Sequence, residues 1–133
     1  MAFEKFEGMK IKHMPKVSIR ANGNIGFSSG AVDKFDLRNS TYCRLYMDRD
    51  AYKIGFEFTN TEEENVTAKV FSRQMDCFIR AKAFLEHYSI NYSETKVFMA
   101  KRDTSTGYIV IDLKNPLYTR GEKKKKGKGG DAI

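Results

Sequence analysis

The sequence predicts an α+β fold in which strongly twisted antiparallel sheets and short helices form a β-β-β-β-α unit. Two observations lead to this prediction. Four strand-like segments lie between residues 41 and 80, and two of them, residues 42–47 and 66–73, send successive side chains to opposite faces with the period of a β-strand. A fifth segment, residues 81–88, places apolar side chains at helical spacing. At 133 residues the chain fits one domain with a buried core.

The chain is expected to begin with an N-terminal extension over residues 1–15, with a short strand at 9–13. Residues 16–21 alternate in the manner of a strand. Asn22-Gly23 then supplies the positive backbone angles of a tight hairpin turn. The return strand is predicted at residues 24–27.

A short helix is predicted after this hairpin. Ser28-Ser29 provides an N-cap, because a serine hydroxyl accepts a hydrogen bond from a free backbone N–H of the first turn. The helix should run through Phe35, and residues 38–41 should form a loop.

The central unit follows this loop. Its strands are expected at residues 41–47, 52–58, 66–73 and 76–80. Aspartates favour the first turn, at residues 48–50, and the acidic residues 60–65 form a loop. The helix that ends the unit shows one apolar face, composed of Ala81, Phe84, Leu85 and Tyr88.

A final hairpin is predicted from residues 96–101 and 108–113, and it completes a binding domain over residues 16–115. Residues 116–133 are rich in lysine and glycine, and we expect them to form a flexible tail. The helix at 81–88 is short, and its apolar face has a broad sheet to cover. We therefore expect a helix-packed homodimer, formed through this helix and the final hairpin.

The sequence also echoes itself at an offset of 53 residues. Each of the two matching stretches is a strand that enters a helix with an aromatic residue at its end. The matched pairs are Ile25 with Phe78, Val32 with Leu85, Asp33 with Glu86, Phe35 with Tyr88, and Leu37 with Ile90. This echo favours a duplicated strand-then-helix plan.

The net charge of +7 is unevenly distributed. The residues from Arg120 onward include six basic and two acidic side chains, which leaves the rest of the chain mildly basic. Anionic partners such as nucleic acids suit this balance. The sequence contains neither a secretory signal nor a long apolar segment, so we expect a cytoplasmic protein without membrane contact. For a phage-encoded chain, this would be the host cytoplasm.

Two strand segments place basic and aromatic side chains on one face. Alternation over residues 42–47 groups Arg44 with two tyrosines, and alternation over residues 66–73 groups Lys69, Phe71 and Arg73. Cations bind phosphates and aromatic rings stack on bases, so such a face suits single-stranded nucleic acid. The alternative is an ordinary solvent-facing sheet, since tyrosine and phenylalanine are good strand formers.

The β-β-β-β-α order with this basic and aromatic face resembles the positive cofactor 4 and Whirly family of single-stranded-DNA-binding proteins. The phage-type members look similar in the stretches GNIGFSSGAVDKFDL and AKAFLEHYSI. The resemblance implies curved antiparallel sheets packed through helices, and a role in DNA replication, recombination or transcription. Transferring the DNA-contacting positions by strand face suggests Arg20, Arg44, Tyr46, Lys53, Lys69, Phe71 and Arg73.

Catalysis is not expected, and neither is a cofactor. The two histidines lie far apart in the sequence, and Cys43 and Cys77 lack the spacing of metal ligands, so both thiols should be reduced. A mobile cationic arm composed of Lys123, Lys124, Lys125 and Lys126 could add phosphate contacts. Its alternative is a solubilising tail.

The function predicted from the sequence is sequence-tolerant binding of single-stranded DNA, with RNA as an alternative ligand. Two other classes stay open. One is a dimeric β-scaffold regulator that binds duplex DNA, and the other is an interaction module that does not bind nucleic acid. Salt separates the last from the others, because nucleic-acid binding weakens steeply with added salt and an apolar protein interface does not.

Overall fold

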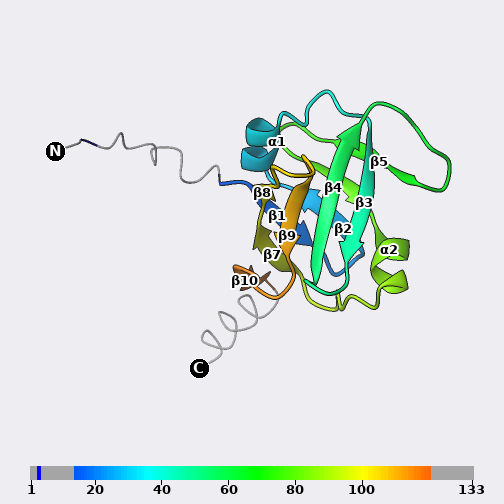
Figure 1. Ribbon diagram of the computed structural model, residues 1–133, viewed down its shortest axis with the longest axis vertical. Helices are drawn as coiled ribbons and strands as arrows, with labels where there is room; N and C mark the ends of the chain where they lie inside the picture. Colours follow the sequence, from blue (N-terminus) through cyan, green and yellow to red (C-terminus); the bar gives the residue numbers. More distant parts are fainter. Residues whose placement is uncertain (1–2, 4–13, 121–133) are drawn as a thin grey trace.

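The computed structural model describes residue 3 and residues 14–120, and its dominant feature is one antiparallel sheet (Figure 1). The strands are β1 (Lys16–Ile19), β2 (Asn24–Phe27), β3 (Tyr42–Asp48), β4 (Lys53–Thr59), β5 (Thr67–Ser72), β6 (Cys77–Arg80), β7 (Lys96–Met99), β8 (Lys101–Arg102), β9 (Ile109–Asp112) and β10 (Tyr118–Thr119). The helices are α1 (Ser29–Phe35) and α2 (Lys82–His87).

The sheet curls into a half-barrel. Its strand order is β10-β7-β1-β2-β6-β5-β3-β4-β9-β8. One stretch of chain links the two sides of this order, because β7 pairs with β10 and β1 near one end while β8, only one residue further on, pairs with β9 at the other end. The sheet therefore bends until β3, β4 and β9 face β1 and β2 across the core (Figure 1).

The predicted α+β fold, with β-β-β-β-α units packed through helices, is wrong. The structure is mostly β, and the two short helices lie at opposite ends of the curled sheet (Figure 1). The four central strands are present in the expected chain order. However, β6 also pairs with β2, and β4 also pairs with β9, so these strands belong to one continuous sheet.

Turn and cap chemistry explains why the local elements form where the sequence predicts them. Gly23 has φ of 89°, the left-handed conformation that the first hairpin turn requires. The Ser28 hydroxyl accepts a hydrogen bond from Ala31 N and thereby caps α1. The same oxygen accepts from Lys16 N and donates to the Met14 carbonyl, so Ser28 also fastens α1 to the start of β1.

The core lies between the two walls of the half-barrel. Phe27 of β2 makes edge-to-face contacts with Phe56 and Phe58 of β4, with ring centroids 5.1 and 5.0 Å apart. Leu85 of α2 is fully buried, and Phe84 packs against the same core. The apolar face of α2 is thus covered within its own chain.

The internal echo of the sequence extends to most of the fold. The order strand, strand, helix, strand, strand occurs twice, with β1, β2, α1, β3 and β4 corresponding to β5, β6, α2, β7 and β9, and the second half has β8 and β10 in addition. Exchanging the two halves keeps the β2–β6 and β4–β9 pairs and converts the β1–β2 and β1–β7 pairs into β5–β6 and β5–β3. The β3–β4 pair has no direct counterpart, because β9 pairs with β8 and not with β7. The matched buried pairs include Val32 with Leu85 and Leu37 with Ile90.

The ends of the sheet differ from the expected domain limits. β10 lies within residues 116–133, the range expected to be a flexible tail, and it pairs with β7. The expected strand at residues 9–13 lies outside the described residues. Neither α1 nor α2 combines the length and apolar character needed to span a membrane, and this holds for the described part of the chain.

Candidate nucleic-acid interface

The outward face of β5 and β6 carries two stacked phenylalanine rings. Phe71 and Phe78 are directly opposed in the strand register, with ring centroids 5.2 Å apart and ring planes 17° apart. They point outward because they alternate with Val70 and Ile79, which are buried in the core. Both rings are half-buried. Each ring therefore covers one face of the other, and the stacked pair is here called the phenylalanine platform.

Cationic side chains lie over this platform. Their charged groups are 4.7 to 5.9 Å from the ring centroids, with Lys69 and Arg80 over Phe71, and Arg73 and Arg20 over Phe78. These are cation–π distances. We call the two rings and the four cations the β5–β6 patch. Asp76 is the acidic neighbour of this patch, with one carboxylate oxygen 3.9 Å from Arg73 Nε.

Arg20 reaches the platform because Gly26 has no side chain. Gly26 of β2 is directly opposite Phe78 of β6. A Cβ atom at Gly26 would lie 2.6 Å from Arg20 Cζ, which is closer than two non-bonded carbon atoms can approach. The missing side chain therefore lets the Arg20 guanidinium lie against the backbone of β2, beside Phe78.

The structure brings four of the predicted site residues together in the β5–β6 patch. They are Arg20, Lys69, Phe71 and Arg73. The predicted register of β5 is confirmed, since Val70 is 7% exposed and its neighbour Lys69 lies on the solvent side. Sequence reasoning missed Phe78 and Arg80. Alternation over Cys77–Arg80 could have revealed them, because it separates Phe78 and Arg80 from Cys77 and Ile79.

Arg44 lies on β3, opposite Thr67 of β5, and carboxylates surround it. Its guanidinium forms ion pairs with Glu63 and with Glu57 Oε1, the latter at 3.3 Å. The hydrogen bond to Glu63 raises the pKa of Arg44. A phosphate would have to compete with these two carboxylates, so Arg44 does not extend the β5–β6 patch.

Tyr46 is also engaged within the protein. Its ring stacks on Tyr108 with centroids 4.3 Å apart and planes 7° apart, and its hydroxyl donates to Glu57 Oε1 at 2.6 Å. The hydrogen bonds to Glu57 and Tyr108 raise the pKa of Tyr46. One face of the Tyr46 ring is therefore already stacked.

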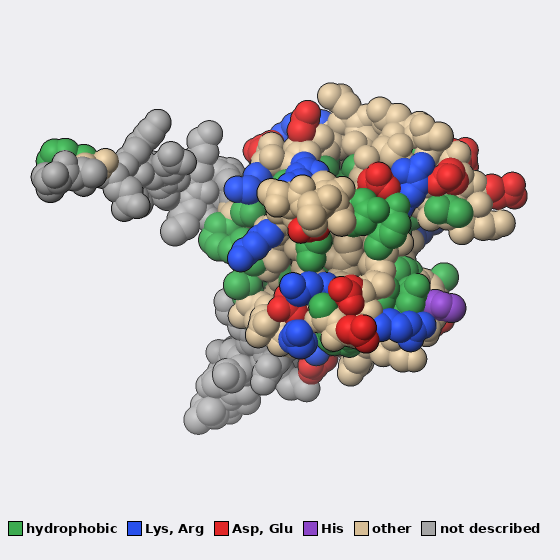
Figure 2. All heavy atoms as spheres, in the orientation of Figure 1, with side chains coloured by type: hydrophobic (Ala, Val, Ile, Leu, Met, Phe, Trp, Pro, Cys, Tyr) green, Lys and Arg blue, Asp and Glu red, His purple; other side chains and the backbone are tan. Residues whose placement is uncertain are grey.

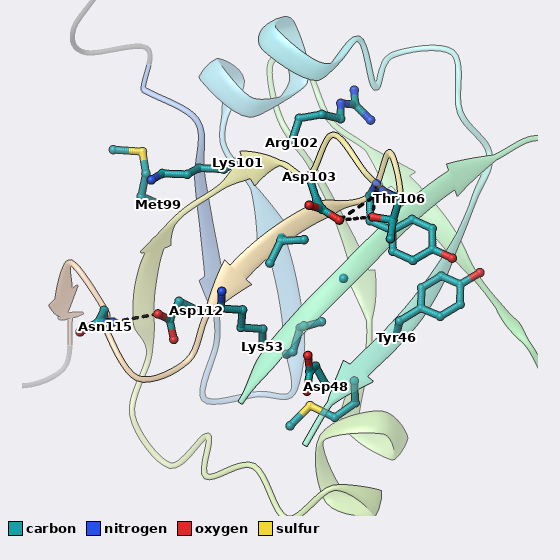
Figure 3. A pocket seen from close by; sticks show the side chains of 15 residues that line it. Tyr46, Asp48, Lys53, Met99, Lys101, Arg102, Asp103, Thr106, Asp112 and Asn115 are labelled. Atoms are coloured by element: carbon teal, nitrogen blue, oxygen red, sulfur yellow. Dashed lines mark hydrogen bonds between the residues drawn. The ribbon is translucent and has the colours of Figure 1, made fainter. Parts of the chain in front are cut away.

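Lys53 lies in a broad cavity of about 760 Å³ beside β4 and β9, here called the Tyr46 cavity (Figure 3). Lys53 is directly opposite Asp112 in the register. The charged side chains that line this cavity are Lys53, Lys101, Arg102, Asp48, Asp103 and Asp112. The two signs balance, and Figure 2 shows them intermixed on this face. The Tyr46 cavity thus lacks the positive potential that attracts a polyanion.

Lys123, Lys124, Lys125 and Lys126 lie outside the described residues. Cys43 and Cys77 are free and buried. Among the described residues, no cluster of three or more histidine, cysteine, aspartate or glutamate side chains could hold a metal ion.

Comparison of the chain with protein-family models, with curated proteins and with solved structures finds no match.

Proposed function

We propose that the protein binds single-stranded nucleic acid through the β5–β6 patch, with little sequence preference and without catalysis. One observation carries this proposal: a pair of stacked, half-exposed phenylalanine rings is surrounded by four cations. Aromatic rings stack on any base and cations neutralise phosphates, which together give sequence-tolerant affinity. Membership of the positive cofactor 4 and Whirly family stays a prediction.

The chemistry of the patch favours an unpaired strand over a duplex. In a duplex the base faces are stacked on one another, so they cannot reach the phenylalanine platform. The cations that now lie over the rings can turn toward phosphates when a base replaces them. A guanidinium can also stack on a base and keep its contact with the ring.

The first test compares a labelled oligodeoxythymidylate with a duplex of the same length over a range of salt concentrations. We expect tighter binding of the single strand, with an affinity that falls steeply as salt is added. Equal or tighter duplex binding would favour the regulator class instead. Binding that is insensitive to salt would favour a protein-interaction module.

Phe71→Leu tests the platform directly. It retains an apolar side chain on the strand but removes the ring. The free energy of binding to oligodeoxythymidylate should therefore become less favourable by roughly 1–3 kcal/mol. Val70→Ala, on the opposite face of β5, is the matched control. It should lower the melting temperature and leave the affinity of the folded protein unchanged. If Phe71→Leu lowers the melting temperature and leaves the affinity for oligodeoxythymidylate unchanged, then Phe71 is a core residue.

The predicted homodimer stays a prediction. Its basis in the sequence is the apolar face of α2, and this face is covered by the sheet of its own chain, with Leu85 fully buried. The β5–β6 patch is built from one chain and needs no second copy. Light scattering at micromolar concentration, with and without oligodeoxythymidylate, measures the oligomeric state.

A further inference from the structure

A single row of outward-facing residues crosses six strands and connects the phenylalanine platform to β10. Each member is directly opposite the next in the strand register. The row runs through Phe71, Phe78, Gly26, Ser18, Val97 and Tyr118. Five inter-strand steps span about 24 Å. The row thus has aromatic residues at both ends and small side chains at its centre.

The small residues form the floor of a groove. This groove has a volume of about 290 Å³ and lies between the phenylalanine platform and Tyr118. Gly26 and Ser18 supply the floor, and we call the cavity the Gly26 groove. Because Gly26 is directly opposite Phe78, the groove begins where the platform ends.

The floor contains a buried hydroxyl that has no partner among the residues that the structure describes. Ser18 is only 9% exposed and lines the groove. Its hydroxyl forms no hydrogen bond with any other side chain or backbone group in the described part of the chain. A buried hydroxyl without a partner costs free energy, so such groups are normally paired. The groove therefore offers a donor to an incoming acceptor.

The edges of the groove are cationic. Lys16, Arg20 and Arg120 line it, together with a single carboxylate, that of Asp76. Lys16 lies at the far end, with Nζ 5.8 Å from the centroid of Tyr118. Burial and the neighbouring Arg73 lower the pKa of Arg20, Asp76 raises it, and Arg120 lowers it further. Cations held this close together are stabilised when an anion lies between them.

We propose that the Gly26 groove binds a phosphodiester group of the same strand whose bases stack on the phenylalanine platform. Lys16, Arg20 and Arg120 neutralise the phosphate, and the Ser18 hydroxyl donates a hydrogen bond to it. The strand then runs across the sheet, from β5 toward β10. This inference rests on the proposed function and adds to it a second contact region and a direction.

Two variants test the groove without altering the platform. Arg120→Gln removes one cation, and Ser18→Val removes the hydroxyl and fills the floor with a side chain that suits a strand. The matched control is Lys101→Gln, which removes one exposed cation from the Tyr46 cavity. The probe is labelled oligodeoxythymidylate. For Arg120→Gln we expect the slope of log affinity against log salt to fall by about 0.7, and for Lys101→Gln no change. Ser18→Val should weaken binding several-fold.

A second measurement separates nucleic acid from free phosphate as the source of the anion. Inorganic phosphate is added at matched ionic strength, and the melting temperatures of the wild-type protein and of Ser18→Val are compared. Phosphate stabilises proteins generally, so only the difference between the two proteins is informative. A larger rise for the wild-type protein supports a phosphate site in the groove.

The outcomes distinguish failure of the groove from failure of the proposed function. If the wild-type protein binds the strand and Phe71→Leu weakens binding, but Arg120→Gln and Ser18→Val behave like Lys101→Gln, then the groove proposal is overturned and the proposed function stands. If the wild-type protein does not bind the strand, the proposed function fails and the phosphodiester proposal fails with it. A phosphate-dependent difference in that case indicates a site for a free phosphate compound.

Discussion

At the scale of single residues, Gly26 couples the sheet to the candidate interface. A Cβ atom at this position would collide with the end of the Arg20 side chain, which is flexible and can move away. Alanine also restricts the unfolded chain more than glycine does. We therefore expect Gly26→Ala to leave stability unchanged or to raise it by up to about 1 kcal/mol. Affinity for oligodeoxythymidylate should fall, because Arg20 leaves the platform.

Gly55→Ala is the control for this experiment. Gly55 also lies within a strand of the sheet, and a Cβ atom there would lie 3.2 Å from Tyr108 Cδ2, in the Tyr46 cavity. It should not change affinity for the oligonucleotide. An equal loss of affinity in both variants would show that the effect is a general distortion of the sheet.

Cys77 predicts a loss of stability at alkaline pH. Burial raises the pKa of Cys77 to about 11, with the negative charge of Asp76 as a further cause. In the unfolded chain the pKa of a cysteine thiol is about 8.5. The unfolded state therefore loses its proton first, and the stability contributed by this thiol is full below about pH 8.5 and is lost as the pH rises toward about 11. The melting temperature of the wild-type protein should fall more over this interval than that of Cys77→Ala; parallel curves would contradict this.

At the scale of secondary-structure elements, local chemistry made most of the strands and both helices predictable. The Asn22-Gly23 turn, the Ser28 cap and the alternation of β3 and β5 are read within a few residues of chain, and the structure retains each of them. β10 was missed because two residues are too few to show a period, and its pairing with β7 is tertiary.

Ser28 allows a direct test of how α1 is fixed to the sheet. Its hydroxyl caps the helix and also bonds to two backbone groups at the start of β1. Ser28→Ala leaves these groups unpaired, and we expect the free energy of unfolding to fall by about 1–3 kcal/mol. Ser29→Ala, one residue further on, should change it little. Denaturant unfolding of the two variants measures the difference. Equal free energies of unfolding would show that the Ser28 hydroxyl does not stabilise the fold more than the Ser29 hydroxyl does.

The candidate site was predictable only in part, for a physical reason. Alternation along β5 identifies Lys69, Phe71 and Arg73, because strand geometry decides which side chains share a face. It cannot show which charges are already neutralised. Arg44 looks like its neighbours in the sequence, but the fold brings Glu63 to it from a loop 19 residues away.

At the scale of the whole molecule, the sheet order was not predictable from this sequence. The pairing of β2 with β6 and of β4 with β9 joins segments from the two halves of the chain. Strand patterns show which face is buried but do not show which strands are neighbours. The internal echo was the available signal, since a duplicated plan allows equivalent strands to pair with each other about an approximate two-fold axis.

The lysine-rich end of the chain is open to a truncation experiment at this scale. Removal of residues 121–133 deletes only two apolar side chains, Ala132 and Ile133, and leaves β10 complete. The melting temperature should stay unchanged. If the lysines bind phosphates, the salt slope of binding to oligodeoxythymidylate should fall by about 0.7 for each phosphate that the shortened chain no longer neutralises. An unchanged slope would assign these lysines to solubility.

The stretch that carries β7 and β8 also determines when the protein can fold. β1 pairs with β7, and β2 pairs with β6. Each strand of the first hairpin therefore needs a neighbouring strand from the second half of the chain. Contacts between residues so distant in sequence require large loops to close, which slows folding to the range of milliseconds to seconds. A nascent chain that ends before residue 96 lacks β7, the second partner of β1, and leaves one edge of β1 unpaired. On the ribosome, the native sheet can therefore form only after most of the chain has been synthesised.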